Sequence, residues 1–189
     1  MFKNAISYII IVTFIFNVLS CKNNNQSSVR QPISHNKKTT GDEKSVNLSK
    51  NLKQREEDYI KNMIAKDSLH QYIDSGHGFW FYYLEQNIQD TIYPKTGDKV
   101  TLNYEIRDLS NNIIYSSKEI GKKTYYVNHE NIFRGFIEAI PLLKTNEEAW
   151  FLFPSNAAYG FHGDDKRIGQ NIPLKMRIKI YQIEKQKNK

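Results

Sequence analysis

Apolar and aromatic residues alternate with polar residues in several short segments of the C-terminal half of the chain. The clearest case is residues 99–107, where every second residue is apolar. This period of two predicts β-strands with one buried and one exposed face. The pair Asn111-Asn112 suits a hairpin turn between two such segments. The predicted strands are Phe79–Leu84, Lys99–Arg107, Ile113–Tyr115, Tyr125–Val127, Ala149–Phe153 and Met176–Ile183.

One segment between these strands has a helical period instead. Phe133, Phe136, Ile137 and Ile140 recur at i, i+3, i+4 and i+7, which is the spacing of a single buried helix face. Asn131 is the predicted N-cap of this helix. Many antiparallel strands with one short buried helix predict an α+β domain, in which a curved sheet wraps around that helix.

A second helical pattern lies nearer the N-terminus. It is predicted to run from Ser49, as N-cap, to Ala65 and to continue for another turn or two towards Ile73. The turn-forming segment Ser75–Gly78 then marks the boundary of the following domain. Because its apolar face is narrow, the segment 49–75 either packs on its own domain or pairs with a partner chain, and the oligomeric state stays open.

The pattern of the first residues predicts a targeting signal rather than a folded element. An apolar run of about fifteen residues, Ala5–Leu19, is too short to span a bilayer, which needs about 20, and is typical of a signal peptide over residues 1–20. Cys21 is the only cysteine and directly follows Ser20. This arrangement resembles a bacterial lipobox and implies that Cys21 is linked to diacylglycerol and holds the protein to a lipid bilayer.

The segment after Cys21 is polar as far as about residue 48. It has too few apolar residues to offset the entropy of ordering, so residues 21–48 are predicted to form a flexible tether. Lys22 stands where an Asp is associated with retention in the inner membrane. We therefore expect attachment to the outer membrane, facing the periplasm.

Charge and composition narrow the classes of function. The chain has 27 Lys and Arg against 20 Asp and Glu, a net charge of +7, but residues 53–189 hold 20 basic and 18 acidic groups. The excess lies mainly in the tether, so no nucleic-acid partner is expected. A single cysteine also excludes an internal disulfide and a cysteine-based zinc site.

A metal ion could in principle be bound by the scattered residues His77, His129, His162 and Asp164. None of them has the close spacing that a metal site needs. We therefore predict no metal.

Four short motifs follow one another in the C-terminal half: Gly97-Asp98-Lys99-Val100 with Tyr104, Ile132-Phe133-Arg134-Gly135-Phe136, Phe153-Pro154 with Ala158-Tyr159-Gly160, and Ile172-Pro173-Leu174. In this order and approximate spacing they resemble the FKBP-type peptidyl-prolyl cis-trans isomerases. The resemblance covers residues 76–184 and leaves residues 185–189 as a basic tail. With the lipobox and tether, the whole chain resembles the FKBP-like lipoproteins associated with gliding motility in gliding bacteria.

The resemblance implies a groove between helix and sheet that twists Xaa-Pro bonds without a cofactor. In that groove Tyr104 and Phe136 would form a wall and the floor, and Tyr159 would offer its hydroxyl to a substrate carbonyl. It further implies proline-containing client polypeptides as partners and a macrolide ligand of the FKBP type. The implied substrate-binding residues are Ile114, Tyr115, Ile132, Phe133, Ile172 and Ile180.

Several positions depart from the usual residues of that family. Tyr115 stands where an Asp is common, Phe136 replaces a Trp, Ile180 replaces a final-strand Phe, and Lys123 or Thr124 replaces a wall Phe. Two hypotheses remain. The first is an isomerase, weakly active, that assists folding or assembly of envelope proteins. The second is a non-catalytic FKBP-like chaperone or structural module that binds extended segments in the same groove.

Overall fold

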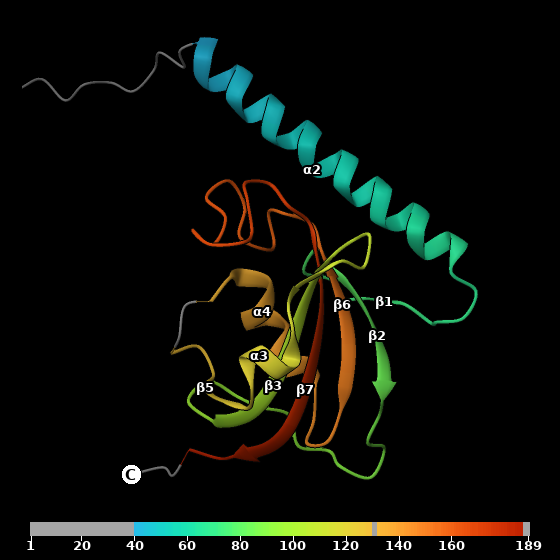
Figure 1. Cartoon of the computed structure of the whole chain (residues 1–189), viewed down its shortest axis with the longest axis vertical. Helices are drawn as coiled ribbons and strands as arrows, with labels where there is room; N and C mark the ends of the chain where they lie inside the picture. Colours follow the sequence, from blue (N-terminus) through green and yellow to red (C-terminus); the bar gives the residue numbers. More distant parts are fainter. Residues whose placement is uncertain (1–39, 130–131, 187–189) are drawn as a thin grey trace, which may run out of the picture. The chain divides into compact units, whose positions relative to one another are not determined.

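The computed structural model describes residues 40–129 and 132–186 (Figure 1). The predicted signal peptide, Cys21 and most of the tether lie outside the described residues. Within the described ranges, no helix is both long and apolar enough to cross a membrane. The elements are α2 (Thr40–Lys66), β1 (Ile73–Asp74), β2 (Trp80–Glu85), β3 (Lys99–Asp108), β4 (Ile113–Tyr115), α3 (Ser117–Ile120), β5 (Lys123–Tyr126), α4 (Arg134–Ala139), a 3-10 turn η1 (Ile140–Leu142), β6 (Glu148–Phe153) and β7 (Leu174–Glu184).

The strands form one seven-stranded antiparallel sheet. Its order is β1-β2-β6-β7-β3-β4, and β5 also pairs with β3. The central pair β3 and β7 is in register from Lys99 opposite Glu184 to Asp108 opposite Leu174, with one bulge between Thr101 and Leu102. The predicted α+β class and curved antiparallel sheet are confirmed, and each predicted strand is present within a few residues of its predicted bounds.

The core lies between one face of the sheet and α4. Phe136, Ala139 and Ile140 are fully buried there, and Figure 1 shows α4 beside the curved strands. Gly135 makes this approach possible, because a Cβ at that position would lie 2.6 Å from the Phe153 ring. The helix therefore packs on β6 at a distance that only glycine permits.

The start of α4 differs from the prediction. Asn131, the predicted N-cap, lies outside the described residues. The N-cap position is Phe133, which has extended backbone and makes no side-chain capping bond. Its ring is buried in the core, so packing rather than a polar cap fixes the start of this helix.

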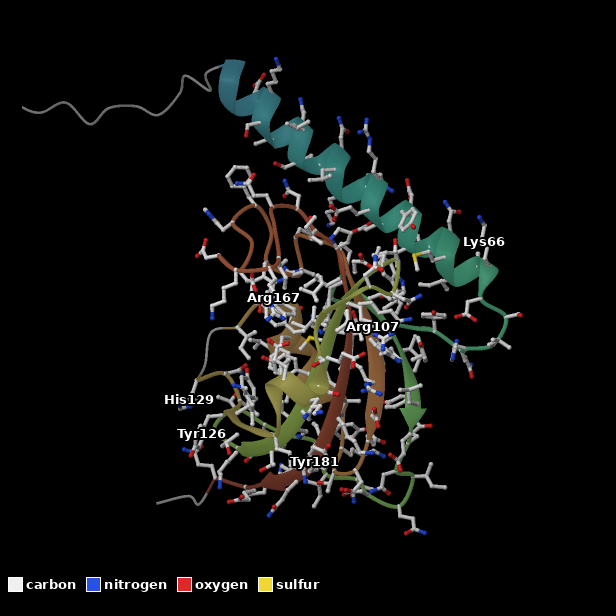
Figure 2. All side chains as sticks on the ribbon, in the orientation of Figure 1. Lys66, Arg107, Tyr126, His129, Arg167 and Tyr181 are labelled. Atoms are coloured by element: carbon white, nitrogen blue, oxygen red, sulfur yellow. The ribbon has the colours of Figure 1, made fainter. Side chains whose placement is uncertain are left out.

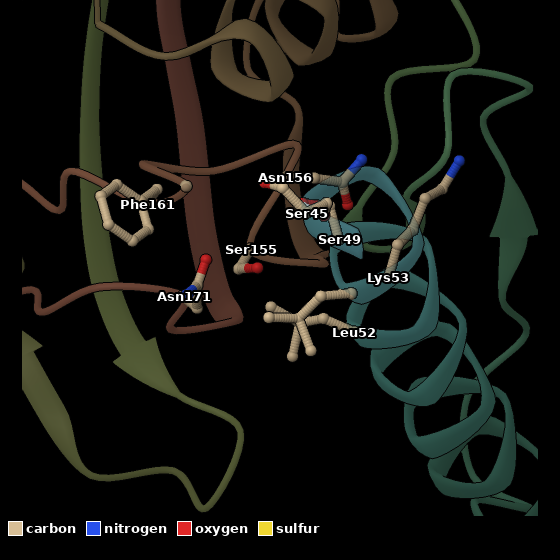
Figure 3. Close-up of a pocket in the computed structure, with 10 residues that line it drawn as sticks. Ser45, Ser49, Leu52, Lys53, Ser155, Asn156, Phe161 and Asn171 are labelled. Atoms are coloured by element: carbon tan, nitrogen blue, oxygen red, sulfur yellow. Dashed lines mark hydrogen bonds between the residues drawn. The ribbon is translucent and has the colours of Figure 1, made fainter. Parts of the chain in front are cut away.

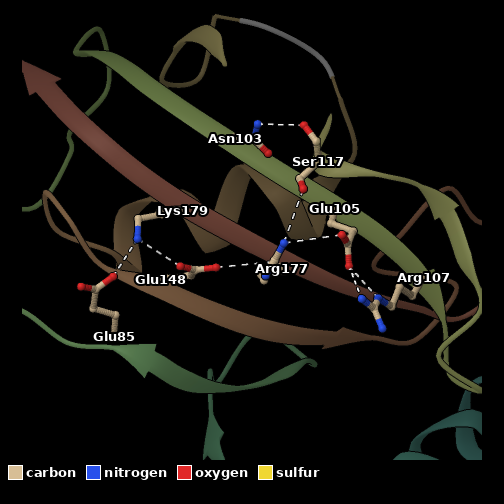
Figure 4. A network of polar contacts seen from close by, with 8 residues as sticks. All are labelled: Glu85, Asn103, Glu105, Arg107, Ser117, Glu148, Arg177 and Lys179. Atoms are coloured by element: carbon tan, nitrogen blue, oxygen red, sulfur yellow. Dashed lines mark hydrogen bonds and ion pairs between the residues drawn. The ribbon is translucent and has the colours of Figure 1, made fainter. Parts of the chain in front are cut away.

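The opposite face of the sheet carries a ladder of alternating charges (Figure 4). Arg177 lies 3.5 Å from both Glu105 and Glu148, and Lys179 lies 2.7 Å from Glu85 and 3.2 Å from Glu148. Glu105 is buried, whereas Lys179 and Glu85 form a solvent-accessible pair that stabilises the fold by at most about 1 kcal/mol. Because the charges of neighbouring strands match only in one alignment, the ladder favours the observed register.

Helix α2 does not have its predicted bounds. It begins at Thr40 rather than Ser49, so the last part of the predicted tether is helical. Residues 42–48 contain neither Gly nor Pro, and extending an existing helix needs no new nucleus. The helix also ends at Lys66 instead of continuing towards Ile73. Asp67 stops it by accepting hydrogen bonds from the Leu69 N–H and the Tyr72 hydroxyl, both at 2.9 Å.

Two contacts hold α2 to the domain. Ile60 is fully buried in a small cluster with Trp80, Leu109 and Leu152. Glu56 is also buried, and its carboxylate accepts hydrogen bonds from the N–H of Ser155 at 2.7 Å and from its hydroxyl at 2.8 Å. Of the two alternatives for this helix, packing on its own domain is the one that the structure shows.

Replacing Ile60 with Ala should lower the free energy of unfolding by about 2–4 kcal/mol, because a buried aliphatic side chain is removed and a cavity is left. The neighbouring Tyr59 is 53% exposed, so Tyr59→Ala should change it by no more than about 0.5 kcal/mol. Urea unfolding of both variants measures the two values. Equal small effects would contradict the docking of α2.

Candidate active site

A cavity of about 360 Å³ opens beside the strands β3 and β4 and the loop after β6. This volume lies within the range of small-molecule and peptide side-chain pockets. Tyrosine rings supply much of its wall, and charged side chains supply its rim. The lining residues are Tyr104, Ile106, Tyr115, Glu119, Ile120, Lys123, Tyr159, Asp164 and Lys166.

An unbroken cluster of aromatic rings connects the three predicted catalytic residues. The ring centroids of Tyr104 and Phe136 are 5.6 Å apart, those of Phe136 and Phe133 are 6.0 Å apart, and those of Phe133 and Tyr159 are 4.9 Å apart. Phe136 is fully buried, whereas Tyr104 and Tyr159 line the cavity. Phe136 therefore supports Tyr104, and Phe133 supports Tyr159.

The hydroxyls of Tyr104 and Tyr159 have no hydrogen-bond partner among the described residues. Burial raises the pKa of both phenols above their usual range, and the nearby Tyr104, Asp164 and Tyr115 raise that of Tyr159 further. Both groups therefore keep their protons at neutral pH. They are hydrogen-bond donors that the protein itself does not use.

Tyr159 stands on a tight turn that is bonded to two helices. Within the turn, the N–H of Gly160 donates to the Ser155 carbonyl at 2.8 Å. The N–H of Gly135 in α4 donates to the Ala157 carbonyl, also at 2.8 Å, and Glu56 of α2 holds Ser155. The turn is thus fixed to α4 and to α2, which sets the position of the Tyr159 ring.

The carboxylate of Asp164 organises the loop between Gly160 and Asn171. Its Oδ2 accepts a hydrogen bond from the Tyr115 hydroxyl at 2.5 Å, and its Oδ1 accepts the backbone N–H groups of Lys166, Arg167 and Ile168 at 2.7–3.0 Å. Partial burial alone would raise the pKa of Asp164, but these hydrogen bonds outweigh it and lower the pKa. Burial and the bond to Asp164 raise the pKa of Tyr115.

Arg167, which is labelled in Figure 2, joins the same loop to the far side of the cavity. Its guanidinium makes two hydrogen bonds to Glu119 in α3, at 2.9 and 2.6 Å, and one to the Ile114 carbonyl at 2.9 Å. The same group lies 4.8 Å from the centre of the Tyr115 ring. The loop is therefore attached to both β4 and α3 across the rim.

The remaining predicted substrate-binding residues lie in varied surroundings. Ile114 and Ile132 are half-buried and pack against the core, as does the buried Phe133. Ile180 is fully buried in β7. Ile172 is 37% exposed and is not part of the cavity lining, so the structure does not bring it to the rim.

Sequence motifs did not indicate several of the residues that line the cavity. These residues are Ile106, Glu119, Ile120 and Lys166. Lys123, rather than the alternative Thr124, is the residue at the wall. The bond between Tyr115 and Asp164 joins positions 49 residues apart, so no local sequence pattern announces it.

A second, larger cavity of about 490 Å³ lies between α2 and the turn after β6 (Figure 3). Leu52 and Ser49 border it from the helix, and Ser155, Phe161 and Asn171 border it from the other side. None of the predicted site residues lines it. Neither Tyr104 nor Tyr159 lines this cavity, so we do not place the active site there.

The four residues weighed for metal binding do not come together. Among the residues that the structure describes, no three His, Cys, Asp or Glu side chains could hold a metal ion. His77 lies 3.8 Å from Glu138, and the ring of His162 packs edge-on against Phe161. Asp164 is bonded to Tyr115 and the loop backbone instead.

Sequence comparison identifies relatives of this domain. Residues 90–181 match the model of the FKBP-type peptidyl-prolyl cis-trans isomerase family. The probable FKBP-type peptidyl-prolyl cis-trans isomerase FkpA of Neisseria meningitidis serogroup B is 30% identical over 131 residues. This match covers 69% of the chain and 46% of the relative, so the chain spans about half the length of that protein.

Solved structures share the fold. A peptidyl-prolyl cis-trans isomerase from Pseudomonas syringae pv. tomato superposes with a TM-score of 0.59 at 18% identity, over 72% of this chain and 96% of that one. FkpA from Escherichia coli superposes with a TM-score of 0.59 at 17% identity, over 74% and 64% of the two chains. These structural matches confirm the fold that the motifs indicated. By the family model and the Neisseria relative, residues 90–181 belong to the FKBP-type peptidyl-prolyl cis-trans isomerase family.

Proposed function

We propose that the protein catalyses cis/trans isomerisation of Xaa-Pro bonds in the cavity beside β3 and β4. The observation that carries this proposal is the Tyr159 hydroxyl, which has no hydrogen-bond partner among the described residues and borders a cavity lined by tyrosine rings. Membership of the family supports the same reaction. The substrates are proline-containing segments of client polypeptides, and a macrolide of the FKBP type is a proposed competing ligand.

The chemistry needs no nucleophile. The barrier of about 18–20 kcal/mol comes from amide resonance, which is lost when the bond is twisted. Water favours the planar, charge-separated amide, so a site that replaces water with rings lowers the relative energy of the twisted form. Tyr104 lines the cavity and provides such a surface, and the buried Phe136 packs against its ring.

Hydrogen-bond donors then hold the carbonyls that flank the twisted bond. The Tyr159 hydroxyl is the proposed donor to one carbonyl, and the backbone N–H of Phe133 is the proposed donor to another. Donors fixed before the substrate arrives stabilise the twisted geometry without reorganising during the reaction. The turn that carries Tyr159 is held by α4 and α2, which meets this requirement.

A non-catalytic binding module was the alternative, because Tyr115 replaces an Asp that usually supports the pocket. The structure weakens that argument. Asp164, in the loop between Gly160 and Asn171, lines the cavity and accepts a hydrogen bond from the Tyr115 hydroxyl. A carboxylate therefore still supports this wall. We therefore favour the isomerase over the chaperone without catalysis.

The cellular setting is also part of the proposal. Cys21 and the apolar run before it support a lipid anchor in the cell envelope, at the outer membrane facing the periplasm. Assistance to the folding or assembly of envelope proteins fits a tethered isomerase. The role in gliding motility is supported by the resemblance of the whole chain alone.

Isomerase activity is tested by following cis/trans relaxation of a Phe-Pro tetrapeptide at 10 °C, where the uncatalysed process takes minutes. Tyr159→Phe should reduce kcat/KM about two- to tenfold, because a neutral hydrogen bond contributes about 0.5–1.5 kcal/mol. The matched control Tyr59→Phe removes a hydroxyl from the exposed side of α2 and should leave kcat/KM unchanged. If the folded wild-type protein does not accelerate the relaxation but still binds the peptide, the non-catalytic alternative is correct.

Asp164 should make the stability of the domain pH-dependent. Because its pKa in the folded protein is below the unfolded value of 3.8, its contribution is present above that pH and is lost as the pH falls through the folded pKa. Asp164→Asn should therefore cost about 1–2 kcal/mol at pH 7, and the difference from wild type should shrink below about pH 4.

Urea unfolding between pH 3 and pH 7 measures this difference. The adjacent Asp165 is exposed, so Asp165→Asn is the matched control and should change the free energy of unfolding at pH 7 by no more than about 0.5 kcal/mol. A difference for Asp164→Asn that stays constant between pH 3 and pH 7 would show that its carboxylate is not bonded as described.

A further inference from the structure

Two lysines at the cavity have no ionic partner among the described residues. Lys123 lies on β5 and Lys166 lies in the loop between Gly160 and Asn171, and both line the cavity. Both side chains are exposed. The two ammonium groups come from different elements and border the same opening.

The carboxylates at this opening are already engaged. Glu119 forms a two-point pair with Arg167, and Asp164 is saturated by Tyr115 and by three backbone N–H groups. Asp165 is in the same loop but does not line the cavity. Lys123 and Lys166 are thus the charged lining groups with no partner among the described residues, whereas the positive charge of Arg167 is compensated by Glu119.

Other lysines nearby are placed differently. Lys122, next to Lys123 in the chain, lies 4.1 Å from the centre of the Tyr181 ring, and Lys118 is exposed on α3 outside the cavity lining. Residues 53–189 carry 20 basic and 18 acidic groups, so the domain as a whole is close to neutral. The pair of lysines without an ionic partner among the described residues is therefore a local feature of the cavity.

We propose that this site selects proline-containing segments with a carboxylate side chain close to the proline, an acidic client peptide. The inference rests on the proposed isomerase function and names its substrate class. The proline and its preceding residue enter the aromatic cavity, while a Glu or Asp one or two residues away meets Lys123 or Lys166 at the rim. A lysine at the same peptide position meets like charge instead.

The test uses three peptides that share a central Leu-Pro pair and carry Glu, Gln or Lys at the two positions that flank it. Isomerisation is measured by NMR exchange in low salt and in 1 M NaCl, without a coupling protease. At low salt kcat/KM should be about three- to tenfold higher for the Glu peptide than for the Lys peptide. The difference should lie mainly in KM and should nearly vanish in 1 M salt, where the Debye length is about 3 Å.

The double variant Lys123→Gln/Lys166→Gln should reduce the Glu-to-Lys ratio to about one, whereas the double variant Lys123→Arg/Lys166→Arg should keep it. Lys118→Gln is the matched control, because it removes a neighbouring positive charge outside the cavity, and it should leave the ratio unchanged. Equal rates for the three peptides with the wild-type protein would overturn the inference and leave the isomerase function standing. Absence of acceleration for all three would instead overturn the proposed function.

Discussion

The contact between Gly135 and β6 is the constraint on which the site depends. A side chain at this position would meet the Phe153 ring at 2.6 Å and the Ala157 carbonyl oxygen at 2.7 Å. Without one, α4 lies close enough for its N–H to bond Ala157 and for Phe136 to reach Tyr104. The absence of a side chain at Gly135 thus allows both the contact of Phe136 with Tyr104 and the hydrogen bond that holds the turn carrying Tyr159.

The sheet was predictable because its pattern is physical and local. Alternation in β3 and β7 follows from one face packing on α4 and the other facing solvent, and this determines the strands almost to the residue. The ends of α2 were not predictable in the same way. Residues 43–51 of the helix are exposed and carry no continuous apolar stripe. The end of the helix depends on Asp67, whose bonds to Leu69 and Tyr72 compete with another helical turn.

The site was predictable only in part, for a related reason. Motifs located the tyrosines, and their rings do lie around one cavity. Burial patterns alone could not show that Phe136 packs against Tyr104 while Phe133 packs against Tyr159, or that Ile172 stays at the surface. The bond from Tyr115 to Asp164 was hidden because it depends on how the loop after Gly160 folds back over β4, and tertiary structure alone brings those two residues together.

This loop divides the site into two parts with different physical demands. The floor is made by core packing, where a change of one methyl group is costly, so it can vary little without unfolding the domain. The rim is made by polar contacts of a surface loop, and charges there can change at small cost in stability. Tyr115 has no carboxylate, and the carboxylate that supports this wall of the cavity comes instead from Asp164 in the loop. In the same way, Lys123 and Lys166 place positive charge at the opening without changing the aromatic rings that pack beneath it. We therefore propose that bond rotation depends on the tightly packed aromatic rings and that the choice of substrate depends on the rim.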